Sequence, residues 1–176
     1  MNPIIHLVKK AQNGDDQAFL MIFQHYQENL YRMAYVYVKN QEEALDVIQE
    51  VAYQSFKSIN TLKNPEYVKT WLIKITINCA INAINKKKKV VPFKAQYEEY
   101  IGSETNENIP LSLSIQDVME YLQEDEKSVI LLRFYQNYTF KEISQALEIP
   151  LGTAKSILYR ALNKLRERME EVDFYE

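Results

Sequence analysis

Apolar residues recur at helical spacing through most of the N-terminal half of the chain. In residues 15–38 they follow the three-to-four-residue period of a helix, and Asp15 or Asp16 is positioned to cap its start. Proline suits the first turn of a helix, where its missing N–H costs no hydrogen bond, and this favours a helix that begins near Pro65. Further helices are predicted from about Gln41 to Ile59 and from about Pro65 to Lys89.

The helical pattern stops between residues 90 and 112. This stretch contains two prolines, a glycine and a run of polar residues, a composition typical of a linker. Beyond it the apolar period returns and predicts two short helices followed by a longer amphipathic one. We therefore expect an all-α protein of two small helical domains, residues 1–89 and 113–176, joined by a flexible linker at 90–112.

The composition favours the same fold class and an intracellular protein. Only 3 glycines and 5 prolines occur in 176 residues, too few for the many turns of a β-sandwich or barrel. Cys79 is the single cysteine, which excludes an internal disulfide and makes the reducing cytoplasm the expected location. The N-terminus has too short an apolar run for a signal peptide, and we expect no membrane-spanning segment.

The sequence carries none of the patterns that catalysis or cofactor binding requires. A glycine-rich phosphate loop, a zinc-ligand spacing and a Ser/His/Asp order are all missing, and His6 and His25 are isolated from each other. We therefore expect no cofactor, no metal ion and no enzymatic activity.

Charge is distributed unevenly along the chain. The net charge is −3, which by itself disfavours a protein that binds nucleic acid alone. Acidic residues concentrate at 41–50 and 120–126, however, and basic residues concentrate at 86–89 and 155–168. This distribution predicts separate acidic and basic faces, one for a basic protein and one for DNA.

A helix-turn-helix is predicted between residues 139 and 168. Thr139 and Glu142 have the spacing of a capping box, and Pro150 ends the first helix. Ala154, Leu158, Ala161 and Leu165 form the apolar face of the second helix. Its opposite face is basic and hydrogen-bonding, as a helix in the major groove requires, and carries Lys155, Ser156, Tyr159, Arg160 and Lys164. The alternative is a helical hairpin with a solvated basic face.

Two helices of the N-terminal half carry unusual polar stripes. Asp46, Gln49 and Glu50 are spaced i, i+3, i+4 and share one face, suited either to a basic partner helix or to solvent. The apolar side of the same helix is predicted to comprise Leu45, Ile48, Ala52 and Phe56.

The second stripe follows the predicted third helix and consists of Lys74, Asn78, Asn82 and Asn85. Asparagine is a poor helix former, so the stripe is costly unless the amides contact something, and it leads into Lys86–Lys89. Amides and lysines together predict a nucleic-acid surface. The alternative is a lysine-rich helix end that interacts favourably with the helix dipole. Trp71 is predicted to fill the core.

In this order the segments resemble the extracytoplasmic-function group of the sigma-70 family of RNA polymerase sigma factors. The likeness covers nearly the whole chain: residues 14–59 resemble the polymerase-binding segment, 70–89 the promoter-melting and −10 recognition helix, and 122–167 the −35 domain. It departs from the family pattern at Asn82, Ile157, Tyr159 and Leu162, and it has lysine where the family often has arginine after the −10 helix.

The resemblance implies a partner and a role for each segment. The first domain would dock on the clamp helices of the β′ subunit of core RNA polymerase through Asp46, Gln49 and Glu50, and the β subunit would be a further partner. The loop from Asn60 to Pro65 would hold a base flipped from promoter DNA. Contacts to the −10 element are expected from Asn60, Lys63, Asn64, Lys74, Asn78, Asn82, Asn85, Lys86 and Lys87. Contacts to the −35 element are expected from Thr153, Lys155, Ser156, Tyr159, Arg160 and Lys164. An anti-sigma factor that restrains the free protein, in a stress or envelope response, is also implied.

Two other functions fit part of the pattern. A conventional helix-turn-helix regulator would bind an operator tightly without polymerase, usually as a dimer. An adaptor whose helical domains bind only proteins would not contact DNA even when polymerase is present.

Overall fold

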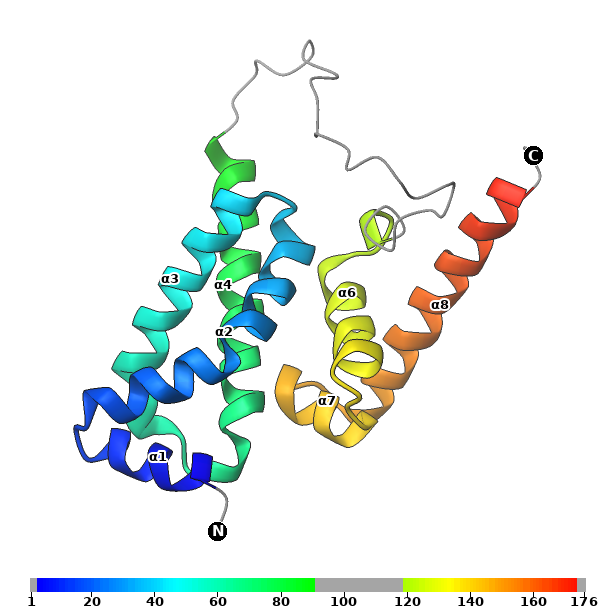
Figure 1. Ribbon diagram of the computed structural model, residues 1–176. Coiled ribbons are helices and arrows are strands. Elements are labelled where there is room, and N and C mark those ends of the chain that lie inside the picture. The colour runs from blue at the N-terminus through cyan, green and yellow to red at the C-terminus, as the bar shows by residue number, and fades with distance from the viewer. Residues whose placement is uncertain (1–2, 91–118, 174–176) are drawn as a thin grey trace.

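The computed structural model describes residues 3–90 and 119–173, and the predicted linker lies almost wholly outside them. The described residues form helices and turns without a β-strand, as the all-α prediction requires. They make two helical units, one from the N-terminal half and one from the C-terminal half, which stand beside each other (Figure 1).

The N-terminal unit begins with a helix that the sequence pattern did not predict. This helix, α1 (Pro3–Gln12), is followed by a turn at Gly14. The φ of Gly14 is 91°, in the left-handed region that glycine adopts at low cost. The remaining elements are α2 (Asp16–Val38), α3 (Gln41–Ser58), the 3₁₀ turns η1 (Ile59–Thr61) and η2 (Pro65–Tyr67), and α4 (Val68–Val90).

Short polar side chains set the helix boundaries of this unit. Asp15 caps α2 by accepting a hydrogen bond from the Ala18 N–H at 3.0 Å, and Asn40 caps α3 in the same way. Pro65 does begin a helical segment, but it is the separate turn η2, and α4 proper starts three residues later.

The buried face of α3 differs from the predicted one. Leu45 and Phe56 were expected inside, yet they are 46% and 47% exposed. Ile48 is buried as predicted and Ala52 is half-buried, and the remaining buried positions are Ala44, Val47, Val51 and Ser55. Successive residues are rotated by about 100° around the helix axis. A predicted apolar stripe that is shifted by one position therefore points partly away from the core. Phe56 still packs edge-on against Phe19, and Trp71 is half-buried against the core.

The C-terminal unit is a helix-turn-helix carried on a short helix. Its elements are α6 (Glu124–Ile130), the π-helical turn η3 (Leu131–Tyr135), α7 (Phe140–Leu147) and α8 (Leu151–Asp173). The predicted capping box at Thr139 and Glu142 is confirmed, and a second one pairs Gln123 with Glu126 at the start of α6. Helix α7 ends at Glu148, which adopts a left-handed φ of 54° and donates its N–H to the Ser144 carbonyl.

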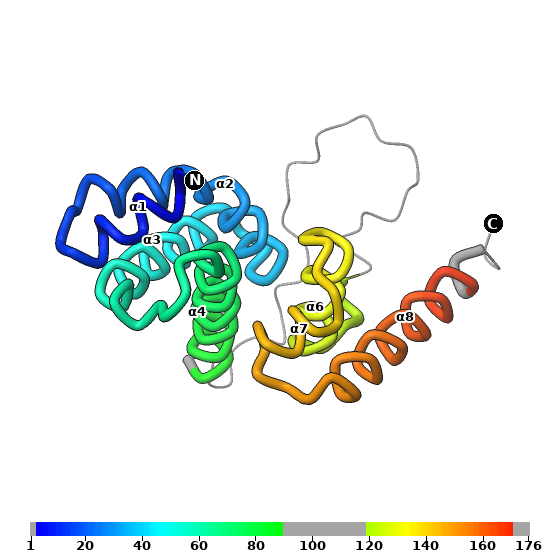
Figure 2. The backbone as a smooth tube through the Cα atoms, turned by 90° about the horizontal axis from the view of Figure 1, so that it is seen from below, coloured from blue at the N-terminus to red at the C-terminus, as the bar shows by residue number. Residues whose placement is uncertain are grey.

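The two units pack directly against each other. Helix α4 lies beside α7, and the view from below shows the two elements adjacent at the junction of the units (Figure 2). Helix α8 lies on the side of the C-terminal unit away from α4 in both views. Three surfaces can bear on function: the groove between α3 and α4 in the N-terminal unit, the exposed face of α8, and the contact surface between the two units.

Candidate functional site

A groove of about 750 Å³ separates α3 from α4 and gathers six of the twelve predicted N-terminal site residues. Asp46 and Glu50 line it from α3, and Asn78, Asn82 and Lys86 line it from α4. The acidic face and the asparagine stripe were expected to be separate surfaces, whereas the structure makes them opposite walls of one groove. Gln49 is exposed on α3 but is not among the residues that line the groove.

Opposite charges meet within this groove. The Lys87 ammonium donates to the Glu43 carboxylate at 2.6 Å, which links α4 to α3 near one end. The Glu50 carboxylate accepts from the Gln54 amide at 2.6 Å. Such exposed contacts are worth little individually, so a partner that brings its own charges can displace them at small cost.

Cys79 lies in the same groove but is unsuited to chemistry. Burial, reinforced by the negative charge of Glu50, raises the pKa of its thiol to about 11. At neutral pH it is therefore a thiol rather than the nucleophilic thiolate. Its role is packing, as the sequence indicated.

The loop between α3 and α4 is held by a residue that the sequence did not single out. Gln12, at the end of α1, donates its amide hydrogens to the Ile59 carbonyl at 3.1 Å and the Leu62 carbonyl at 2.8 Å. The neighbouring Asn60 and Lys63 stay exposed. A lone glutamine at the end of a short helix gives no local signal for such a contact, so only the tertiary structure reveals it.

Asn64 has a local structural task in the same loop. Its side-chain oxygen accepts from the Glu66 N–H at 3.1 Å and thereby caps η2. The residue as a whole is exposed. The loop thus has a fixed backbone and outward polar side chains, a suitable arrangement for holding an unpaired base.

The α4 stripe is continuous, but one end of it is covered. Asn82, Asn85 and Lys86 are exposed. Lys74, by contrast, is ion-paired with Glu148 at the end of α7. Asn78 is exposed as well, so within the stripe it is Lys74 that the C-terminal unit engages, while Lys88 of the lysine run pairs with Glu124 of that unit.

The recognition helix α8 exposes five of the six predicted −35 residues, and four of the five have no ion pair among those described. Thr153, Lys155, Ser156 and Tyr159 are exposed, and Tyr159 is 63% exposed. The Lys155 ammonium lies 5.8 Å from the Phe140 ring centroid, and the Ser156 hydroxyl donates to the Gly152 carbonyl at 2.9 Å. The exposed hydroxyls and ammonium match the donors and acceptors that read base edges and phosphates.

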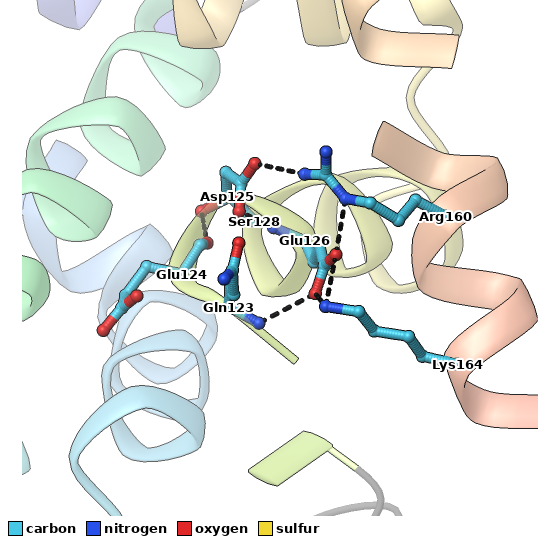
Figure 3. A network of polar contacts seen from close by, with 7 residues as sticks. All are labelled: Gln123, Glu124, Asp125, Glu126, Ser128, Arg160 and Lys164. Carbon is cyan, nitrogen blue, oxygen red and sulfur yellow. Dashed lines mark hydrogen bonds and ion pairs between the residues drawn. The ribbon is translucent and has the colours of Figure 1, made fainter. Parts of the chain in front are cut away.

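The other two predicted −35 residues, the exposed Arg160 and the half-buried Lys164, are ion-paired with carboxylates of the same unit. Arg160 Nε donates to Glu126 at 2.7 Å, Lys164 Nζ donates to the same carboxylate at 2.9 Å, and another Arg160 nitrogen reaches Asp125 at 2.8 Å (Figure 3). Glu126 also accepts from the Gln123 N–H at 2.9 Å. These contacts fasten α8 onto α6, a role that the sequence did not reveal.

Glu126 is the centre of this network and is fully buried. Burial raises the pKa of its carboxyl, but hydrogen bonds from Lys164, the Gln123 N–H and Arg160 outweigh burial and leave the pKa below its usual value. Glu126 is thus a buried carboxylate that is ion-paired with two cations, Arg160 and Lys164. Removing the carboxylate charge would leave Lys164 without its described partner and Arg160 with Asp125 alone.

Within residues 3–90 and 119–173, no group of three or more histidine, cysteine, aspartate or glutamate side chains is arranged to hold a metal ion. In the same ranges, none of the helices is both long enough and apolar enough to cross a membrane.

Comparison with protein families assigns both helical units. Residues 22–90 match the model described as Sigma-70 region 2, and residues 118–167 match that described as Sigma-70, region 4. Among curated relatives, RNA polymerase sigma factor SigV of Bacillus subtilis (strain 168) is 32% identical over 166 residues, covering 94% of this chain and 99% of the relative. The ECF RNA polymerase sigma factor SigW of the same organism is 26% identical and covers 94% of this chain and 96% of that protein.

Solved structures have the same fold. CnrH in complex with the cytosolic domain of CnrY aligns with a TM-score of 0.70 at 15% identity, covering 96% of this chain and 97% of that one. The sigma factor RpoE in complex with the anti-sigma factor NepR from Bartonella quintana also gives 0.70, at 19% identity, and covers 86% of this chain and 96% of that chain. With both regions in order and a full-length relative above 30% identity, the chain belongs to the extracytoplasmic-function group of the sigma-70 family of RNA polymerase sigma factors.

Proposed function

We propose that this sigma factor engages core RNA polymerase and opens the −10 element on the two walls of the α3–α4 groove. The observation that carries this proposal is the meeting of Asp46 and Glu50 with Asn78, Asn82 and Lys86 along one groove. Acidic side chains on α3 suit a basic helix of a protein partner, and amides with ammonium groups on α4 suit a DNA strand.

The polymerase contact is assigned to the exposed face of α3. Asp46, Gln49 and Glu50 project from one side of the helix, and none of the three is buried. The clamp helices of the β′ subunit are the proposed partner, and the β subunit is proposed to hold region 4. Carboxylates at such an interface act mainly on association rate and register, so reversing their charge is a sensitive probe.

The −10 contact combines the loop with the α4 stripe. We assign Asn60, Lys63 and Asn64 to a base that leaves the duplex, since Gln12 holds the backbone beside them. Flipping a base costs a few kcal/mol of stacking, and a preorganised loop lowers the further cost of ordering the protein. The track for the opened strand is Lys74, Asn78, Asn82, Asn85, Lys86 and Lys87.

The −35 contact is assigned first to the outward face of α8. Thr153, Lys155, Ser156 and Tyr159 are free to meet base edges and phosphates of a major groove. For Arg160 and Lys164 a direct DNA contact stays a prediction. Their pairing with Glu126 supports an additional role in fixing the angle at which α8 enters the groove.

A regulatory partner is proposed as well. The neighbour of known structure, RpoE, was solved with the anti-sigma factor NepR, and its fold is shared by this chain. We propose that an anti-sigma factor binds this chain in the cytoplasm. The test is co-purification of a tagged chain from its host before and after an envelope stress. Recovery of one protein at near-equal ratio before stress supports the proposal, and recovery of polymerase subunits alone contradicts it.

The central experiment is transcription by the purified chain with core RNA polymerase on sheared host genomic DNA, with sequencing of transcript 5′ ends. Discrete start sites that share a −35 and a −10 motif are the expected result. Absence of discrete starts from a folded chain and an active core enzyme would overturn the proposal and favour an operator-binding regulator.

The docking face is tested by the double substitution Asp46→Arg and Glu50→Arg. Both side chains are exposed, so the helical fold should persist while binding to core polymerase is lost. The matched control is Glu167→Arg with Glu170→Arg, the same change of charge on exposed positions of α8. Equal recovery of core polymerase by both double variants would move the docking face away from α3.

A further inference from the structure

Five lysines of region 2, here residues 3–90, gather at the end where the loop between α3 and α4 lies. Two stand in the last turn of α1, one in the last turn of α3, one in the loop and one at the start of α4. Figure 1 shows α1 at this end of the N-terminal unit, where α3 finishes and α4 begins. These lysines, the basic end of region 2, are Lys9, Lys10, Lys57, Lys63 and Lys69.

The lysines of the basic end are accessible, and none of them has an ion pair among those described. Four are exposed, and Lys69 is half-buried. At the other end of α4, by contrast, Lys87 is ion-paired with Glu43 of α3. Lys88, beside it, is ion-paired with Glu124 of region 4, here residues 119–173. The charges of the basic end are therefore available to an anionic partner.

Few carboxylates balance the basic end. Asp15 and Asp16 follow α1, and Glu66 lies in η2. The Asp15 carboxylate is occupied as the cap of α2, where it accepts from the Ala18 N–H at 3.0 Å. Positive charge therefore exceeds negative charge at this end, although the net charge of the chain is −3.

The two lysines of α1 are held at a fixed place beside the loop. Gln12 donates to two carbonyls of the loop. Lys9 precedes Gln12 by three residues and so lies one turn earlier on the same side of the helix, and Lys10 follows it. Val8 and Ala11 anchor the opposite side of α1 in the core. The helix thus presents ammonium groups next to the proposed base pocket without needing to be ordered first.

Exposed tyrosine rings lie among these lysines. Tyr53 is 58% exposed, and the Lys57 ammonium lies 5.8 Å from its ring centroid. Tyr67, in η2, is 54% exposed and precedes Lys69 by two residues. Surfaces that bind single strands combine ammonium groups for the phosphates with aromatic rings on which unpaired bases stack.

An anionic membrane surface fits the basic end less well. A helix that binds the membrane interface needs an apolar face that is free to enter the lipid. The apolar side of α1 is instead packed into the core, through Val8 and Ala11 and through the partly buried Ile4 and Leu7. An opened nucleic-acid strand is therefore the partner that the basic end suits best.

We propose that the basic end binds the sugar–phosphate backbone of the opened promoter strand, on the far side of the flipped base from the α4 track. The inference rests on the proposed roles of the loop and of α4, and it extends the contact to α1 and to the end of α3. Its new contacts are Lys9, Lys10 and Lys57. Lysines meet phosphates as point charges, so these contacts position the strand without reading its sequence. A strand that is held on both sides of the flipped base is less free to return to the duplex.

The test is the salt dependence of promoter binding by the holoenzyme. Core polymerase is combined with the parent chain, with Lys9→Gln/Lys10→Gln, or with Lys9→Arg/Lys10→Arg. The fluorescent template carries a promoter found by start-site sequencing, with its −10 element left unpaired, and anisotropy measures the affinity across a salt series. Lysine, glutamine and arginine have similar helix propensities, so α1 should persist in all three chains, as circular dichroism can verify.

The glutamine variant should flatten the slope of log affinity against log salt concentration by about 1.4, because each single-strand phosphate contact contributes roughly 0.7. Its affinity at moderate salt should fall several-fold. The arginine variant keeps both charges and should retain the parent's slope. Equal slopes for the parent and the glutamine variant would overturn the proposal, and so would equal flattening by the glutamine and arginine variants.

Truncated templates locate the contact along the strand. Shortening the unpaired strand on one side of the −10 element should abolish the difference between the parent and the glutamine variant, and shortening it on the other side should not. A difference that survives both truncations would place the lysines away from the strand and refute the proposal.

Vesicles of phosphatidylglycerol and phosphatidylcholine test the membrane alternative. Vesicle binding that is lost in the glutamine variant, together with unchanged promoter slopes, would overturn the proposal in favour of a lipid surface. Failure of the proposed function is distinguishable from these outcomes. A parent chain without discrete start sites contradicts both proposals, whereas a parent with start sites and a glutamine variant of equal slope contradicts the basic end alone.

Discussion

The two helices proposed to face DNA, α4 and α8, hold their cations in different ways. On α4, Lys74 is ion-paired with Glu148, which belongs to the other region. On α8, Arg160 and Lys164 are ion-paired with Glu126, which belongs to their own region. Lys88 of α4 also pairs across the contact, with Glu124, whereas Lys87 pairs with Glu43 of its own unit, so only part of the α4 charge is held by the other region.

The difference assigns different tasks to similar side chains. Lys74 can meet a phosphate only when Glu148 of the other unit no longer occupies its ammonium group. A cation whose partner is buried in the same domain keeps α8 seated on α6 throughout, and the helix enters the groove as a rigid element. Basic residues on a recognition helix are thus not all alike, and burial of the partner distinguishes them.

The largest expected effect is from Glu126→Gln, which leaves Arg160 and Lys164 without their shared carboxylate. Glutamine can still accept the capping hydrogen bond from the Gln123 N–H, so the loss comes chiefly from charge. We expect the free energy of unfolding to fall by about 1–3 kcal/mol at pH 7, through the loss of charge-assisted hydrogen bonds to a buried carboxylate. Urea denaturation of parent and variant measures it.

The second capping box supplies the matched control for this substitution. Glu142 also sits at the third position of its helix and also accepts from its capping residue, Thr139, but it is exposed. Glu142→Gln should cost under about 1 kcal/mol. Equal losses from Glu126→Gln and Glu142→Gln would show that capping, rather than the buried ion pairs, accounts for the effect.

The effect of Glu126 on stability should also depend on pH. Its carboxyl has a folded-state pKa below the ordinary value, so its contribution is fully present above that ordinary value. It is lost as the pH falls through the folded-state pKa, when the folded protein takes up the proton. The gap between parent and Glu126→Gln should therefore be constant near neutrality and close in acid, below about pH 4.

The next effect concerns the loop on region 2, through Gln12→Ala. The substitution leaves the Ile59 and Leu62 carbonyls without the amide that joins them to α1. We expect a loss of about 1–2 kcal/mol in the free energy of unfolding and a larger relative loss in open-complex formation, since the loop is the proposed base pocket. Permanganate reactivity of the opened thymines measures the second quantity.

A nearby glutamine controls for the change of side chain. Gln17 is exposed on α2, so Gln17→Ala should change neither stability nor open-complex formation measurably. Gln12→Ala could lower stability but leave open-complex formation equal to that of the control. The hydrogen bonds from Gln12 to the loop would then make no contribution to promoter melting.

The features that sequence reasoning predicted are those with local causes. Helices α2, α3, α7 and α8 follow from apolar periodicity, and the caps at Asp15 and Thr139 follow from side chains three residues from the N–H groups they accept from. The same holds for the exposed polar stripe on α3. A cause that lies within one helical turn leaves a readable pattern.

What the sequence did not predict depends on residues far apart along the chain. Glu126 meets Arg160 across 34 positions, and Gln12 meets Ile59 across 47. Nothing in the sequence around either residue of such a pair indicates its partner. The π-helical turn before Gln136 also interrupts the apolar period from which helices are predicted. The misplaced face of α3 has a different reason: Leu45 and Phe56 are large and apolar, but the core-facing line passes beside them.

The smallest expected effect is on salt dependence, and it tests the contrast between α4 and α8 within α8 itself. Lys155 is exposed and has no ion pair among those described, whereas Arg160 is already balanced by Glu126 and Asp125. A phosphate contact releases counterions, and each one adds roughly 0.9 to the slope of log affinity against log salt concentration. For polymerase holoenzyme on a −35-dependent promoter, Lys155→Gln should flatten the slope by about that amount, and Arg160→Gln should flatten it less. Filter binding between low and moderate salt measures both slopes. Equal flattening by the two variants would mean that Arg160 contacts a phosphate although it is ion-paired with Glu126 and Asp125. Cations that bind DNA and cations that hold α8 against α6 would then not be separate groups on this helix.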